Sequence, residues 1–241
     1  MTPVVTLDRV TKTYGEVVAL DEVTLAFPRG RFVAMMGPSG SGKSTLLHCA
    51  AALDPPTSGS VMIGDVDVSR LSETRRTELR RKHVGFVFQS YNLMPTVTVE
   101  ENITLPLRLA GVRPDRAWLG ELVDRVGLRG RLRHKPTELS GGQQQRAAIV
   151  RALAARPDVV FADEPTGALD LRSAAQVLEL LRELVDELGQ TVVMVTHDPA
   201  AAACAHDTLV LADGKVVDVL NAPSPEDLAV RLARLSRESV A

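Results

Sequence analysis

The sequence predicts an α/β fold built around a mostly parallel sheet that is covered on both faces. Short, continuous apolar runs are typical of such buried strands, and the chain has them at residues 32–36, 84–88, 159–162 and 191–195. Helical segments alternate with the last two runs. A glycine-rich loop and an apolar helical run follow the first one, from residue 37 onward. This order of elements is that of an α/β core.

Two regions differ from this core. Residues 4–7 and 17–27 have the alternation of short antiparallel strands separated by polar turns, and residues 59–65 form another such strand after the turn signal at 54–58. Residues from about 91 to 151 show helical spacing of apolar residues and several proline breaks. We therefore expect an N-terminal antiparallel β-subdomain and an α-helical subdomain inserted into the core.

The C-terminal part predicts a hairpin and then a separate helix. Two apolar segments within residues 208–219 flank Asp213-Gly214, which is a typical hairpin turn. A linker rich in proline and serine follows at residues 221–225, and then an amphipathic helix from Glu226 to about Arg237. The predicted organisation is one domain over residues 4–220, followed by a linker and helix over residues 221–241.

The glycine-rich loop after the first strand predicts a phosphate site. Glycines allow backbone N–H groups to curl around an anion, because no Cβ blocks left-handed conformations, and the next helix points its positive end at the same place. Lys43 would place a charge on the outer phosphates, and the Ser44 hydroxyl would bind magnesium. A plain Gly/Ser-rich turn would not explain both glycines, the Lys and the Ser in this setting. The loop consists of Gly37, Pro38, Ser39, Gly40, Ser41, Gly42, Lys43 and Ser44.

Two acids follow the apolar run at residues 159–162. Asp163 and Glu164 would lie at the carboxyl edge of the sheet, where open α/β sheets bind ligands. Asp163 would hold the magnesium shell, and Glu164 would position and deprotonate an attacking water. A solvated junction before Pro165 explains either acid alone, but it explains the pair beside a phosphate loop poorly.

Three other side chains could have either a ligand-binding role or a purely structural one, and the sequence pattern around them does not decide between the two. His197 follows the last buried run, so it could contact a terminal phosphate, or it could belong to the helix start that Asp198 indicates. Gln89 ends another strand and could reach metal or water, or it could be a plain surface residue. Tyr14 lies in a polar turn, where its ring could stack on a purine or cover the edge of a small sheet.

A second glycine-containing segment, residues 139–143, lies at the start of a predicted helix past the middle of the chain. Taken alone, this segment could equally be a flexible loop. Together with the other motifs it resembles the nucleotide-binding subunit of ATP-binding cassette (ABC) transporters, over residues 4–220 approximately. The resemblance implies a P-loop NTPase (RecA-like) core. In the first half of the chain, the resemblance matches Tyr14 to the adenine-stacking loop, Gly37 through Thr45 to Walker A, and Gln89 to the glutamine loop. The signature corresponds to Ser140, Gly141, Gly142 and Gln143. Walker B and its catalytic glutamate correspond to Asp163 and Glu164, the D-loop to Asp170, and the switch histidine to His197.

The resemblance also implies the chemistry. The cofactors are ATP and Mg²⁺, and the matched residues would contact the nucleotide. Two cassettes would pack head to tail as a homodimer, with Ser140 and Gly142 of one closing on ATP held by the other. The D-loop departs mildly from the family, with Gly167 where a serine is common. The implied catalytic residues are Lys43, Gln89, Glu164 and His197, and the implied magnesium ligands are Ser44, Gln89 and Asp163.

Within the family, residues 85–95, 99–107 and 163–170 look like the macrolide-exporter and lipoprotein-releasing branch. This implies an integral membrane permease subunit that contacts the segment from Gln89 to Glu101, and a location at the cytoplasmic face of the membrane. Two alternatives remain. One is a non-transporting ATPase that signals through a membrane partner, as in cell division, and the other is a soluble cassette that acts on ribosomes or nucleic acid.

Composition and charge argue against the last alternative. The chain has 28 Lys and Arg against 30 Asp and Glu, a net charge of −2, so no nucleic-acid partner is expected. Basic clusters at 75–76, 80–82 and 129–135 have acids nearby and lack interleaved aromatics. The first five residues show no secretory signal, and no apolar run approaches the ~20 residues that cross a bilayer, so the chain is expected to be soluble by itself.

Overall fold

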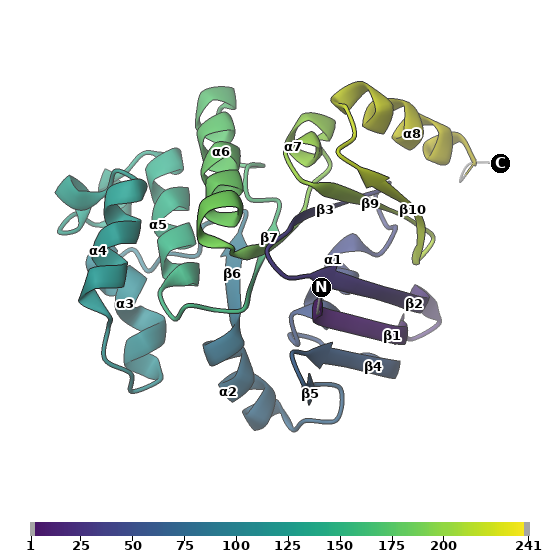
Figure 1. Ribbon diagram of the computed structural model, residues 1–241, viewed down its shortest axis with the longest axis horizontal. Helices are drawn as coiled ribbons and strands as arrows, with labels where there is room; N and C mark the ends of the chain where they lie inside the picture. Colours follow the sequence, from purple (N-terminus) through teal and green to yellow (C-terminus); the bar gives the residue numbers. More distant parts are fainter. Residues whose placement is uncertain (1–2, 239–241) are drawn as a thin grey trace.

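The computed structural model describes residues 3–238. Residues 1–2 and 239–241 lie outside the described residues. The first pair belongs to the N-terminal segment in which no secretory signal was found, and the last three residues end the predicted 221–241 tail. Figure 1 shows a central sheet with helices on both sides, a small sheet at one end and a group of helices at the other. The expected α/β architecture is thus confirmed, with a mixed sheet at its centre.

The central sheet has six strands in the order β10-β9-β3-β8-β7-β6. Each predicted buried run is one of its strands, and all neighbouring pairs from β9 to β6 are parallel. Only β10 runs antiparallel, because the hairpin turn returns it beside β9. The strands are β3 (Phe32–Met36), β6 (Val84–Phe88), β7 (Val159–Asp163), β8 (Thr191–Val195), β9 (Asp207–Ala212) and β10 (Lys215–Asn221).

Both faces of this sheet are buried, which explains why its strands are continuously apolar. Alternate residues of β3 point to opposite faces. Phe32, Ala34 and Met36 join a core formed with α5, α6 and α7, whereas Val33 and Met35 join a second core formed with α1 and the small sheet. The helices of these two layers are α1 (Lys43–Ala50), α5 (Gly141–Leu153), α6 (Leu171–Leu188) and α7 (Pro199–Ala203).

The small N-terminal sheet has four strands in the order β2-β1-β4-β5, all antiparallel. Its first strand, at 12 residues, is longer than the predicted segment 4–7, whereas the second, also 12 residues, agrees with the predicted segment 17–27 to within one residue. Several register shifts interrupt the pairing of these two strands, so the apolar alternation of the first changes phase and conceals its full length. The strands are β1 (Pro3–Tyr14), β2 (Val17–Pro28), β4 (Ser58–Ile63) and β5 (Val66–Asp67), and α2 (Glu73–His83) leads from this sheet to β6.

The regular elements between residues 91 and 151 are all helical, as expected, and they lie together at the left of Figure 1. Two of the α-helices begin with a capping box, in which Thr98 pairs with Glu101 and Ser140 pairs with Gln143. The helical elements are α3 (Val99–Leu109), α4 (Arg116–Arg125), η1 (Arg129–Arg131), η2 (Pro136–Glu138) and α5.

The tail folds as a hairpin and a helix. Asp213 and Gly214 both have positive φ, 48° and 74°, as the tight turn between β9 and β10 requires. Helix α8 (Pro225–Glu238) begins one residue before the predicted start and packs on α7, where Leu228 is fully buried. Of the helices in the described part of the chain, none is long and apolar enough to cross a membrane.

Candidate active site

The phosphate loop connects the buried strand β3 to helix α1. Gly42 caps α1 in a left-handed conformation, with φ +95°, and no side chain of the described residues caps the helix start with a hydrogen bond. The backbone of Gly42 passes so close to β2 that an added Cβ would lie 2.3 Å from the Ala19 carbonyl oxygen. By contrast, a Cβ at Gly40, with φ +80°, would meet nothing within 4 Å. The loop therefore holds one face tightly against the protein and leaves the other open to a ligand.

Lys43 folds back over this loop. Its ammonium donates hydrogen bonds to the carbonyl oxygens of Gly37 and Pro38, at 2.9 and 2.8 Å. Burial lowers the pKa of Lys43, and the nearby carboxylates of Glu164 and Asp163 oppose that shift. A partly desolvated cation that faces an open loop of backbone N–H groups is well suited to an anion with several oxygens.

The loop also contains an orphaned polar atom. The Ser41 hydroxyl is buried and has no hydrogen-bond partner among the described residues. A cavity of about 220 Å³ opens beside the loop, lined by Val17 to Ala19 and by residues 40 and 42–45. Backbone amides, a lysine and the Ser44 hydroxyl converge there, which is a donor set that fits a triphosphate.

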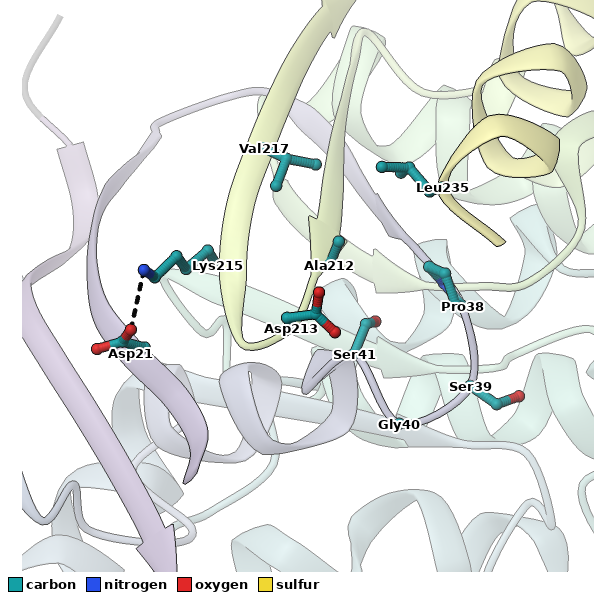
Figure 2. A pocket seen from close by; sticks show the side chains of 10 residues that line it. All are labelled: Asp21, Pro38, Ser39, Gly40, Ser41, Ala212, Asp213, Lys215, Val217 and Leu235. Atoms are coloured by element: carbon teal, nitrogen blue, oxygen red, sulfur yellow. Dashed lines mark ion pairs between the residues drawn. The ribbon is translucent and has the colours of Figure 1, made fainter. Parts of the chain in front are cut away.

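A larger cavity of about 610 Å³ borders the same loop, beneath the β9–β10 hairpin and α8 (Figure 2). Among the described residues that line it, the one cation, Lys215, is already paired with Asp21 at 3.0 Å, and Asp213 adds a second carboxylate. These charges would repel a triphosphate. The smaller cavity, with Lys43 and the start of α1, is therefore the better phosphate site.

The parallel strands end level with one another, and this brings the other predicted residues together. Phe88 of β6 pairs with Asp163 of β7, which pairs with Val195 of β8, which pairs with Met35 of β3. The residues that follow these strand ends therefore share one edge of the sheet. They are Gln89 after β6, Glu164 after β7, His197 after β8 and Gly37 after β3.

Asp163 lies at this edge with its carboxylate half buried. Burial raises its pKa, while the neighbouring His48 and Lys43 side chains act in the opposite direction. The His48 Nε2 lies 4.0 Å from an Asp163 oxygen, on the inner side of α1. His48 was not predicted as a site residue, because the sequence of α1 does not show which of its side chains faces β7.

Glu164 and His197 form a direct pair. The His197 Nδ1 lies 3.0 Å from both carboxylate oxygens of Glu164. The imidazole is largely exposed, at 73%, whereas the carboxylate is 20% exposed. The helix-cap alternative for His197 does not hold, because Asp198 is the residue that caps α7.

Gln89 is exposed and lies against the loop that follows Glu164. An added Cβ on Gly167 would come within 2.7 Å of the Gln89 Nε2, so the amide touches that backbone. Tyr14 ends β1 and is 49% exposed. Its hydroxyl donates to Asp54 at 2.6 Å, which raises the pKa of Tyr14 to about 12 and fixes the ring beside α1.

The signature segment lies on a different part of the protein. The Ser140 hydroxyl accepts from the Gln143 amide at 3.3 Å, and the Ser140 amide donates to the Gln143 side chain at 3.0 Å. An added Cβ on Gly142 would be 3.0 Å from Ser173 of α6, and one on Gly141 would be 2.7 Å from the Tyr91 hydroxyl. The Asp170 carboxylate caps α6 through Ser173, which lowers its pKa. These neighbours belong to α6 and the loops beside it, not to the phosphate loop.

A phosphate loop at the edge of a parallel sheet, with acids at the ends of neighbouring strands, defines a nucleotide-binding protein of the P-loop class. The sequence model of the ABC transporter family matches residues 20–167. The chain therefore belongs to the ABC transporter family.

Relatives and solved structures agree with this assignment. The chain is 44% identical over 229 residues to the macrolide export ATP-binding/permease protein MacB of Marinobacter nauticus, covering 92% of this chain and 35% of that protein. It is 43% identical to the uncharacterized ABC transporter ATP-binding protein YvrO of Bacillus subtilis, covering 88% and 95%. The dimeric cassette MJ0796 bound to ADP and Pi is similar with a TM-score of 0.81 at 43% identity, covering 91% of this chain and 99% of that one. The chain spans about a third of the length of the macrolide export relatives.

Proposed function

We propose that this chain is the ATP-hydrolysing subunit of an ABC transporter that drives or controls a membrane permease of the exporter or lipoprotein-release type. One observation supports the proposal most strongly. The parallel strands end level with one another, and this brings Asp163, Glu164 and His197 next to the phosphate loop and Lys43. The macrolide export relatives are named ATP-binding/permease proteins, which supports a permease partner. The cassette would then lie at the cytoplasmic face of the membrane, held there by that partner.

The residues around the loop would bind the nucleotide. Tyr14 offers an exposed ring for the adenine, and the backbone N–H groups of the loop, with Lys43, face the triphosphate. Ser44, Gln89 and Asp163 supply the oxygen ligands that Mg²⁺ prefers. Bound there, Mg²⁺ would neutralise charge on the outer phosphates.

Glu164 would act on the attacking water. Its carboxylate can accept the proton of a water placed in line with the terminal phosphate. With Nδ1 protonated, His197 donates to that carboxylate and holds it at the sheet edge. The same imidazole is exposed enough to reach a phosphate oxygen.

A second copy of the chain would complete the site. Ser140 and Gly142 lie at the start of α5, among neighbours that belong to α6 and its preceding loop. Their hydroxyl and amide donors are therefore placed to reach ATP on another copy rather than on their own. The similar cassette MJ0796 is described as dimeric with ADP and Pi, which supports this arrangement.

Hydrolysis by the purified chain tests the proposal. We expect phosphate release that requires both ATP and Mg²⁺, and a Lys43→Ala variant that binds ATP about 10- to 150-fold more weakly, since a hydrogen bond to a charged group contributes about 1.5–3 kcal/mol. Lys215→Ala is the matched control, because it removes a lysine near the same loop that is paired with Asp21. Absence of phosphate release, or equal ATP affinity in the Lys43 and Lys215 variants, would contradict the assignment.

A further inference from the structure

Gln145 is a fully buried polar residue in the second turn of α5, the helix that Ser140 caps. Its side-chain Nε2 donates hydrogen bonds to the carbonyl oxygens of Pro165, at 2.6 Å, and Phe88, at 3.3 Å. Phe88 directly precedes Gln89, and Pro165 directly follows Glu164. One amide thus joins the signature helix to the backbone beside two residues of the candidate active site.

The orientation of this amide follows from its partners. Both are carbonyl oxygens, which can only accept, so the nitrogen must face them. The other end of the amide, Oε1, is buried and has no partner among the described residues. A buried oxygen without a hydrogen bond destabilises the fold. Gln145 is therefore a poor choice for stability alone, and its two directed hydrogen bonds suggest a functional reason for its presence.

The backbone that Gln145 holds is strained. Glu164 has φ +48°, a left-handed conformation that is costly for a residue with a side chain. Such strain persists only where several contacts fix it. The Glu164 amide donates to Val195 at 3.0 Å, and its carbonyl accepts from Gly167 at 3.1 Å. The hydrogen bond from Gln145 to the Pro165 carbonyl oxygen fixes the next residue.

A second contact from α5 holds the loop after Gln89. The Arg151 guanidinium donates to the carbonyl oxygen of Tyr91, at 2.9 Å, and to that of Asn92. Both Tyr91 and Asn92 also have positive φ, 58° and 51°. Helix α5 is therefore tied to both ends of the segment that contains Gln89, with Gln145 at the buried end and Arg151 at the outer end.

We propose that Gln145 is a positioning residue for hydrolysis, which fixes Glu164 and Gln89 relative to the helix that carries Ser140. Its side chain is fully buried and acts through the Pro165 and Phe88 backbones. A change in the position of α5, such as closure of the dimer would produce, would then reach the Glu164 carboxylate directly. The inference rests on the proposed ATPase function.

Kinetics of a Gln145→Met variant test this role. Met preserves length and apolar bulk and removes the two hydrogen bonds. We expect kcat for ATP hydrolysis to fall about 10- to 100-fold, as for other small misplacements of a reacting group, while the Kd for ATP stays within about twofold of the parent. The matched control is Gln190→Met. The Gln190 side chain also donates to two carbonyl oxygens, those of Pro157 and Thr191 at 3.2 Å each, but it lies at the opposite ends of β7 and β8.

The possible outcomes separate the alternatives. A folded Gln145→Met protein with the kcat of the Gln190→Met control would overturn the inference. A parallel loss of kcat, ATP affinity and thermal stability would also overturn it, because that result describes a purely structural residue. If Gln145→Met does not fold, Gln145→Asn is measured in the same way, since it keeps an amide that is too short to reach both carbonyls. An inactive parent protein would instead reject the proposed ATPase function itself.

Discussion

Replacing Glu164 by glutamine is expected to lower kcat for ATP hydrolysis by about two to four orders of magnitude and to leave ATP binding intact. The amide keeps the shape of the side chain and can still bond to the His197 Nδ1, but it cannot accept a proton from water. The phosphate loop and Lys43 are unchanged by this substitution. The measurement is the rate of phosphate release at saturating ATP, together with the Kd for ATP.

Glu78→Gln is the control for this experiment, because Glu78 is an exposed acid on α2, outside the site. It should hydrolyse ATP at the parent rate. A Glu164→Gln protein that keeps more than about a tenth of the parent rate would show that another group activates the water.

Replacing Gly42 by alanine is expected to destroy the phosphate site. The new methyl group would lie 2.3 Å from the Ala19 carbonyl oxygen and 3.2 Å from the Leu20 side chain, in a backbone with φ +95°. Left-handed strain and overpacking together predict a loss of roughly 2–5 kcal/mol in unfolding free energy. The loop must move to relieve the overlap, so ATP affinity should fall on the order of a hundredfold. Chemical denaturation and nucleotide titration measure the two effects.

Gly64→Ala separates strain from overlap. Gly64 also has positive φ, +56°, in the turn between β4 and β5, but an added Cβ there meets nothing within 4 Å. This variant should show only the backbone strain and keep the parent affinity for ATP. If Gly42→Ala is no more destabilised than Gly64→Ala and binds ATP as well, the tight approach of the loop to β2 is not needed for the site.

The sequence was informative where burial and chemistry leave a pattern on consecutive residues. Strands buried on both faces must be apolar throughout, so β3, β7 and β8 were recognisable with little error in their bounds. Because parallel strands end at a common edge, residues that follow different strands, such as Asp163 and His197, could be placed in one site from sequence.

The parts that could not be predicted depend on contacts between distant segments. Register shifts along β1 break the alternation that marks a strand, so its length was underestimated. His48 and Gln145 lie within helices whose sequence shows no sign of which side chains face the active site. The hydrogen bond from Tyr14 to Asp54 joins residues that are far apart in the chain and have no common motif.

In the proposed dimer, the signature of one copy closes the nucleotide site of the other. A structure of the Glu164→Gln protein with ATP and Mg²⁺ can show this closure, because hydrolysis is blocked and the closed state accumulates. We expect two copies related head to tail, with the Ser140 hydroxyl of each at a hydrogen-bond distance of about 3 Å from the terminal phosphate bound by the other. An ATP-loaded structure in which Ser140 lies far from every triphosphate would contradict it.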